Sequence, residues 1–152
     1  MKGIMKHMGF LAALAVLALV SCERNNPDGD ESTLKIKVDK SQVSFPAEGG
    51  EQTVTMTNYS LWAINGGYED MVFEDGKWTY VNYVSPKSSS GEATYSSNVL
   101  DGGWYHATIP DKGRAPKLSV TVDKNEGKAR WATVVMTVGE LSTDIKIYQA
   151  AK

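Results

Sequence analysis

The chain has very little of the chemistry that cysteine and histidine bring to a protein. It contains one cysteine and two histidines in 152 residues, so it cannot form an internal disulfide or a cysteine-based metal site. No charge of one sign dominates either, since 16 basic and 18 acidic residues give a net charge of −2. Nucleic-acid binding usually requires a basic face. We therefore expect no nucleic-acid partner, no metal and no cofactor.

The main apolar run is too short to cross a membrane. It extends from Phe10 to Val20, after a basic start that contains Lys2 and Lys6. A transmembrane helix needs roughly 20 apolar residues, whereas the core of a signal peptide needs about 7–15. We therefore expect residues 1–21 to be a signal peptide that is removed on export and takes no part in the fold.

The single cysteine follows this run directly. The segment Leu19-Val20-Ser21-Cys22 resembles the lipobox of bacterial lipoproteins, in which small residues precede an invariant cysteine. The resemblance implies a diacylglyceryl group on the Cys22 sulfur, cleavage before Cys22 and a further acyl chain on the new amino terminus. Two or more acyl chains anchor a protein firmly. The expected partner at Cys22 is membrane lipid, and the alternative is a secreted protein with a spare thiol.

Residues 22–33 are expected to be a lipidated, flexible linker. The segment ERNNPDGDEST is polar and has no apolar periodicity, so it cannot bury enough surface to order itself. Its acidic residues also resemble the acidic patch after the cysteine in surface-exported lipoproteins of some Gram-negative bacteria. We expect an outer-membrane lipoprotein of the cell envelope, and leave open whether it faces the periplasm or the cell surface.

From residue 34 onward, apolar and polar residues alternate. This period of two is typical of strands that bury one face, and turn signals rich in Gly, Asn and Asp separate the segments at intervals of about 8–12 residues. We predict an all-β fold, an antiparallel β-sandwich over residues 34–152. Val120 and Val134 should be buried in it, and Thr133 should face outward.

The order of the motifs resembles the BACON family. That family has Gly-Gly before a Thr/Val-rich strand, then a Trp, then an Asn followed by an Arg, and a closing strand that ends in Gln. The corresponding positions here are Gly49, Gly50, Trp62, Asn125, Arg130 and Gln149. The resemblance implies an immunoglobulin-like sandwich. It also implies a carbohydrate-binding role, which was proposed for the family from its association with glycan-degrading enzymes, or a plain spacer role.

Residues 65–103 stand where the family usually has a short connection, and we interpret them as an insertion. Within it, MVFEDGKWTYV predicts a β-hairpin with a type I′ turn at Asp75-Gly76. On the second strand Trp78, Tyr80 and Asn82 should point the same way. Flat aromatic faces with polar groups at their rim suit sugar rings. We therefore predict a glycan-binding row at these three residues, the alternative being that the aromatic rings pack on the domain.

Trp131 is a second candidate for glycan binding. It alternates with the apolar face that contains Ala132 and Val134, so it should point outward. An exposed tryptophan is less expected than a buried one. In contrast, we assign Trp62 and Trp104 to the interior of the sandwich.

The sequence lacks the common catalytic motifs. Once the signal peptide is removed, His106 is the only histidine, and there is neither a Gly-x-Ser-x-Gly motif nor a Gly-rich phosphate loop. The carboxylate pairs Glu69–Asp70 and Glu74–Asp75 are sequence neighbours, whereas the two carboxylates of a glycosidase face each other across about 5–9 Å. We therefore predict that the protein is not an enzyme, and a hydrolase is only the third hypothesis.

Two non-catalytic functions are consistent with these features. In the first, the sandwich of a membrane-anchored lipoprotein binds a polysaccharide or a mucin-type glycan. In the second, it is a spacer or protein-interaction module that has outer-membrane protein partners. An exposed aromatic row would favour the first function, and an uncharged patch or open edge strand would favour the second.

Overall fold

The computed structural model describes residues 35–87 and 97–152. The expected signal peptide 1–21, the linker 22–33 with Cys22, and residues 88–96 of the expected insertion lie outside the described residues. Within the described ranges no helix has the length and apolar character needed to span a membrane.

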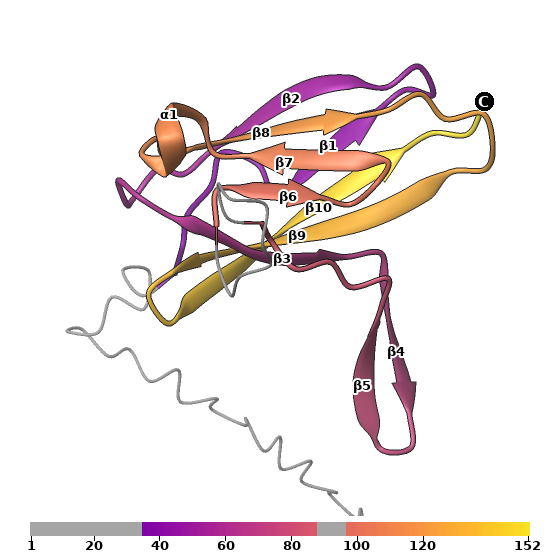
Figure 1. The fold of residues 1–152 in the computed structure, drawn as a ribbon, viewed down its shortest axis with the longest axis horizontal. Helices are drawn as coiled ribbons and strands as arrows, with labels where there is room; N and C mark the ends of the chain where they lie inside the picture. Colours follow the sequence, from indigo (N-terminus) through magenta and orange to yellow (C-terminus); the bar gives the residue numbers. More distant parts are fainter. Residues whose placement is uncertain (1–34, 88–96) are drawn as a thin grey trace, which may run out of the picture.

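The strands form two four-stranded sheets and a separate hairpin (Figure 1). The first sheet has the order β1 (Gln42–Phe45), β10 (Leu141–Gln149), β9 (Arg130–Val138), β3 (Ala63–Tyr68). The second has the order β2 (Gly50–Thr55), β8 (Lys117–Val122), β7 (Tyr105–Thr108), β6 (Val99–Asp101). The hairpin consists of β4 (Asp70–Glu74) and β5 (Lys77–Val81), and a single helical turn, α1 (Pro110–Gly113), precedes β8.

This strand order is that of an immunoglobulin-like sandwich. β3, β9 and β10 take the places of strands C, F and G, while β2, β8 and β7 take the places of strands B, E and D. The predicted all-β sandwich is therefore confirmed. One detail differs from the prediction of a purely antiparallel fold, because β1 pairs with β10 in a parallel direction.

The core lies between the two sheets and is built from alternate residues of the strands. Val120 and Val134 are fully buried, as predicted. Thr133 lies between the buried Ala132 and Val134 on β9 and is partly exposed on the other face of the strand. Trp62 is also buried, in agreement with its predicted interior position. The period-two pattern of the sequence therefore identifies which side of each strand packs into the sandwich.

The hairpin β4–β5 extends away from the sandwich (Figure 1). Asp75 and Gly76 have φ angles of 51° and 77°, and two consecutive positive φ values are the mark of a type I′ turn, as predicted. After β5 the chain returns to the sandwich through a bridge between Val84 and Gly67 of β3. Residues 65–103 therefore contain the end of β3, the projecting hairpin and β6 of the second sheet.

Buried polar side chains close one end of the sandwich. The Gln149 side chain donates to the backbone oxygens of Pro46, Ala47 and Asp123 at 3.2, 3.2 and 2.8 Å. Its own oxygen accepts a hydrogen bond from Arg130 Nε at 2.8 Å. Because a buried amide is costly unless its hydrogen bonds are made, this network holds the loops of that end in place.

Asn125 and Gly49 also support this end of the sandwich. The buried Asn125 side chain donates to the backbone oxygens of Lys128 and Ala150 at 2.8 and 2.9 Å. Gly49 has a φ of +82°, and a Cβ there would lie 2.2 Å from the Val122 oxygen, so only glycine fits. These two residues therefore fix the backbone at the same end of the sandwich as Gln149 and Arg130.

Candidate functional site

The outer face of the first sheet presents aromatic side chains to solvent. Trp131 on β9 points outward, as predicted, and is 54% exposed. Its ring lies 4.3 Å, between centroids, from that of Tyr148, which pairs directly with it on β10. Tyr148 follows the buried Ile147 on β10, so alternation along the strand predicts that Tyr148 faces outward. The sequence does not show that β10 pairs with β9, which is what brings Tyr148 next to Trp131.

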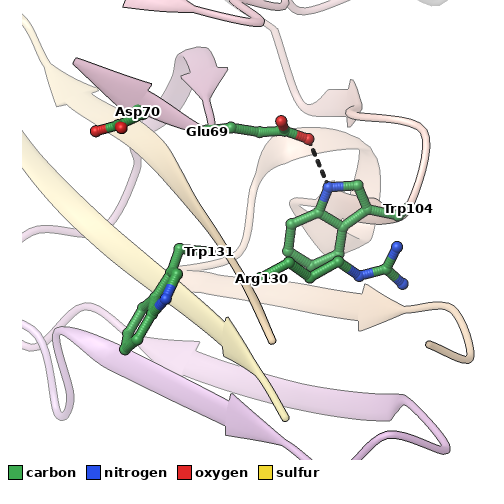
Figure 2. Close-up of a pocket in the computed structure, with 5 residues that line it drawn as sticks. All are labelled: Glu69, Asp70, Trp104, Arg130 and Trp131. Carbon is green, nitrogen blue, oxygen red and sulfur yellow. Dashed lines mark hydrogen bonds between the residues drawn. The ribbon is translucent and has the colours of Figure 1, made fainter. Parts of the chain in front are cut away.

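A cleft lies at the end of the sheet where β9 begins and β3 passes into β4. Five residues line it: Glu69, Asp70, Trp104, Arg130 and Trp131. Its volume is ≈ 460 Å³, and we call it the tryptophan cleft. Figure 2 shows Trp131 on one side, Trp104 with Arg130 on the other, and the two carboxylates along a third. Volumes of about 300–1,000 Å³ are usual for small-molecule sites.

Trp104 forms one wall of this cleft. It packs against the core, as predicted, but it is only partly buried and is not enclosed between the sheets. The indole N–H donates to Glu69 Oε1 at 2.7 Å (Figure 2), and the Arg130 guanidinium carbon lies 4.3 Å from the ring centroid. A tryptophan needs an acceptor for its N–H when it is partly buried, and its face attracts a cation. Both partners lie far away in the sequence, so alternation alone could not indicate them.

Glu69 connects the cleft to the base of the hairpin. While its Oε1 accepts from Trp104, its Oε2 accepts a hydrogen bond from Asn82 Nδ2 at 2.6 Å. Asn82 lies just beyond β5 and has a φ of 52°. The Asn82 amide therefore does not continue the row of Trp78 and Tyr80, and instead fixes the hairpin to the cleft.

Asp70 lies at the mouth of the cleft and is exposed. One of its oxygens accepts a hydrogen bond from the backbone N–H of Met71 at 2.7 Å, which orients the carboxylate. A carboxylate has acceptor capacity for several hydrogen bonds. Asp70 can therefore accept hydrogen bonds from the hydroxyl groups of a ligand that rests against Trp131.

The hairpin carries the other aromatic residues predicted to bind glycans. Trp78 and Tyr80 lie on one face of β5 and are 64% and 52% exposed, so they do not belong to the core. Phe73 pairs with Trp78 across the hairpin, with 5.2 Å between ring centroids. The structure thus brings Trp78 and Tyr80 together on one face and places Trp131 on the sheet.

Tyr80 lies where the hairpin meets the outer face of the sheet. Its ring is 4.8 Å from that of Tyr68 and 5.7 Å from that of Tyr83. These rings line a second concavity of ≈ 220 Å³, which we call the tyrosine hollow; its lining residues are Asn65, Gly66, Tyr68, Tyr80, Tyr83 and Val135. Tyr68 and Tyr83 could not be identified from the sequence, because their contacts depend on how the base of the hairpin lies against the sheet.

His106 lies on the outer side of the second sheet, between two carboxylates. Its Nδ1 is 3.2 Å from Asp101 and its Nε2 is 3.5 Å from Asp123. A hydrogen bond from the Gly103 backbone N–H is the main cause that lowers the pKa of Asp101, and the hydrogen bond and charge of Lys87 lower it further. In residues 35–87 and 97–152, no group of three or more His, Cys, Asp or Glu is arranged to hold a metal ion.

Comparison with protein families finds one match within the chain. Residues 83–150 match the BACON family, which is described as "Putative binding domain, N-terminal". The matched segment contains Trp104, Arg130, Trp131 and Gln149, and it begins after the hairpin. No curated protein matches the chain.

Two solved structures are similar to the chain. The NMR structure of a protein from Bacteroides thetaiotaomicron is 26% identical, with a TM-score of 0.53, and the match covers 86% of this chain and 98% of that one. A Bacteroides ovatus GH5 xyloglucanase in complex with a XXXG heptasaccharide is 18% identical, with a TM-score of 0.44, over 78% of this chain and 19% of that one. The first likeness agrees with the sandwich fold, and the second is too distant to support an argument about ligands.

Proposed function

We propose that the protein binds glycans at its tryptophan cleft without catalysis. In support, residues 83–150 match the BACON family, which is described as "Putative binding domain, N-terminal". The observation that carries this proposal is the composition of the cleft, where two tryptophans, two carboxylates and a guanidinium line one open space. The apolar face of a sugar ring packs on Trp131, and the carboxylate of Asp70 accepts hydrogen bonds from sugar hydroxyls.

The charges of the cleft favour a neutral glycan. Glu69 and Asp70 contribute two negative charges and Arg130 one positive charge, so the lining is negative on balance. A uronate, a sulfate or a sialic acid would bring a like charge to Asp70, and such a juxtaposition is unfavourable. The proposed ligand is therefore a neutral polysaccharide or a neutral mucin-type glycan.

A pair of exposed-residue variants tests the cleft. Trp131→Ala removes the open aromatic wall, and Leu61→Ala is the matched control because Leu61 is 53% exposed and lies before β3. We expect Trp131→Ala to weaken binding of a neutral glycan by about tenfold and the control to leave it unchanged. Affinity electrophoresis and calorimetry measure this. Equal affinity of both variants would overturn the assignment of the cleft.

We also propose that Cys22 carries the lipid anchor of an outer-membrane lipoprotein. The support is the sequence, where the lipobox-like segment follows a short apolar run. Cys22→Ser should lose metabolic labelling with a palmitate analogue and should release the domain or stall its processing. Labelling of the variant at the wild-type level would rule out this anchor.

A second candidate function is protein interaction through the hairpin. Phe73 and Trp78 expose a large apolar surface on an element that projects from the sandwich (Figure 1). Such a surface suits an outer-membrane protein partner. Under this alternative, Trp78→Ala should weaken co-purification with envelope proteins and leave glycan binding at the wild-type level.

A further inference from the structure

We infer that the glycan site extends beyond the tryptophan cleft. The tyrosine hollow is a second sugar subsite, and the ligand is therefore a glycan chain that reaches both concavities. This inference rests on the proposed function, which concerns the cleft alone. It follows from four features of the described residues: the common face of the two concavities, the chemistry of the hollow, its rigidity and its link to the cleft.

The two concavities lie on the same face of the first sheet. Trp131 lines the cleft and Val135 lines the hollow, and both point outward from β9. Four residues of a strand extend about 13 Å. Tyr68, which pairs with Thr133 between them, lies next to Glu69 of the cleft in the sequence. A single sugar ring cannot touch both concavities at this separation, but a short chain can.

The hollow has the chemistry that suits a sugar ring. Tyr80 is 52% and Tyr83 is 51% exposed, and their rings offer apolar faces with hydroxyl groups at the edge. Asn65 adds an exposed amide at the rim. None of the residues that line the hollow is charged at neutral pH. The hollow and the negatively charged cleft therefore agree in favouring a neutral ligand.

The hollow is built in advance of binding. Tyr83 packs on the backbone of Gly66, where a Cβ would lie 2.7 Å from the Tyr83 hydroxyl oxygen, and that hydroxyl donates to the backbone oxygen of Asn65 at 3.3 Å. Tyr68 is buried, and its hydroxyl donates to Asp144 at 3.3 Å. Side chains that are already fixed lose little entropy when a ligand binds, which raises the affinity that weak contacts can reach.

The two concavities are held in a fixed relation. Asn82 directly precedes Tyr83 of the hollow, and its side-chain amide donates to Glu69 of the cleft at 2.6 Å. The same glutamate accepts from Trp104 on the far wall of the cleft. One hydrogen-bonded chain therefore runs from the edge of the hollow to the wall of the cleft. A ligand that occupies both concavities meets a single preorganised surface.

The experiment measures how the affinity depends on the length of the ligand and on the position of the substitution. Calorimetry on the full chain uses cello-, xylo- and manno-oligosaccharides of up to about six units, together with the corresponding polysaccharides. Four substitutions are compared with the wild type, namely Trp131→Ala in the cleft, Tyr80→Ala and Tyr80→Phe in the hollow, and the control Leu61→Ala. Circular dichroism and thermal melting check the fold, and Tyr80→Phe, which keeps the ring, should bind like the wild type.

For a glycan that binds, we expect affinity to rise with length until the chain reaches both concavities. Trp131→Ala should weaken binding of every length, whereas Tyr80→Ala should weaken only the longer chains, by about tenfold. An equal effect of Tyr80→Ala on all lengths, or no effect on any, would overturn the second subsite and leave the proposed function intact. If no glycan binds to the wild type, the proposed function fails, and the inference fails with it.

Discussion

The closed end of the sandwich and its outer aromatic face use side chains in opposite ways. At the closed end Asn125 and Gln149 are polar, buried and hydrogen-bonded to backbone oxygens of several loops. On the outer face Trp131 and Tyr80 are largely apolar, exposed and in contact with other aromatic rings. The first arrangement costs free energy if any partner is lost, and the second leaves surface available to a ligand.

The comparison separates the residues that hold the closed end of the sandwich together from those that can contact a ligand. Gly49, Asn125 and Gln149 are needed for the fold, so a related chain could keep them and bind something different. Arg130 belongs to both regions, because its Nε donates to Gln149 while its guanidinium packs on Trp104. The closed end therefore also positions one wall of the tryptophan cleft.

The largest effect should come from a charge placed inside the sandwich. Val134→Asp buries a carboxylate without a partner, and we expect it to lower the free energy of unfolding by about 4 kcal/mol or more. The control Thr133→Asp, one residue along β9, faces outward and should cost less than about 1 kcal/mol. Urea denaturation followed by tryptophan fluorescence measures both. Similar losses in the two variants would mean that the two faces of β9 are wrongly assigned.

The next effect should come from the closed end. Gln149→Leu keeps the approximate size but removes the three hydrogen bonds to backbone oxygens and the acceptor of Arg130 Nε. Each of the three oxygens keeps one other donor, so the main cost is the unpaired Arg130 Nε in addition to the lost bonds, and we expect a loss of about 3 kcal/mol. The same variant should also weaken glycan binding, because Arg130 loses the shortest of the three hydrogen bonds that hold it against Trp104. Urea denaturation and calorimetry measure the two effects. A stable variant with wild-type binding would show that the two regions are independent.

Alkaline pH should weaken the fold through a buried phenol beside the cleft. Burial, followed by the charge of Glu69, raises the pKa of Tyr105 from 10 to about 12. The folded state therefore keeps a proton that the unfolded state releases, so this stability is present below pH 10 and is lost as pH rises toward 12. The expected loss is about 1.4 kcal/mol per pH unit in that window.

Tyr105→Phe provides the control for this pH dependence. Among the described residues the Tyr105 hydroxyl is buried and has no hydrogen-bond partner, so its removal should cost little at neutral pH. The difference in unfolding free energy between wild type and variant, followed by urea denaturation from pH 8 to pH 11, should change in favour of the variant as pH rises. A constant difference would contradict the raised pKa.

Alternation in the sequence was sufficient to predict β2, β8, β9 and β10, because it depends on neighbours along the chain. It identified the inward side of β8 and β9, while the Asp-Gly dipeptide identified the turn at Asp75-Gly76. It could not identify the cleft, because Glu69, Trp104 and Arg130 come together only when the sheet edge, a loop and a strand start meet in space. The sequence therefore predicts toward which face of the sheet a side chain points, but it does not predict which residue an outward-facing side chain contacts.

The smallest effect on stability should come from the tip of the hairpin. Trp78 is highly exposed and its ring contact is with Phe73, so Trp78→Ala should change the free energy of unfolding by less than about 1 kcal/mol. If the glycan row extends along the hairpin, the variant should also bind long neutral glycans about tenfold more weakly. Thr79→Ala is the matched control, since Thr79 is exposed on the opposite face of β5.

A large loss of stability in Trp78→Ala would mean that Trp78 supports the fold. Wild-type glycan affinity with an intact fold would instead assign the hairpin to a protein partner, and would confine glycan binding to the sheet face and the base of the hairpin.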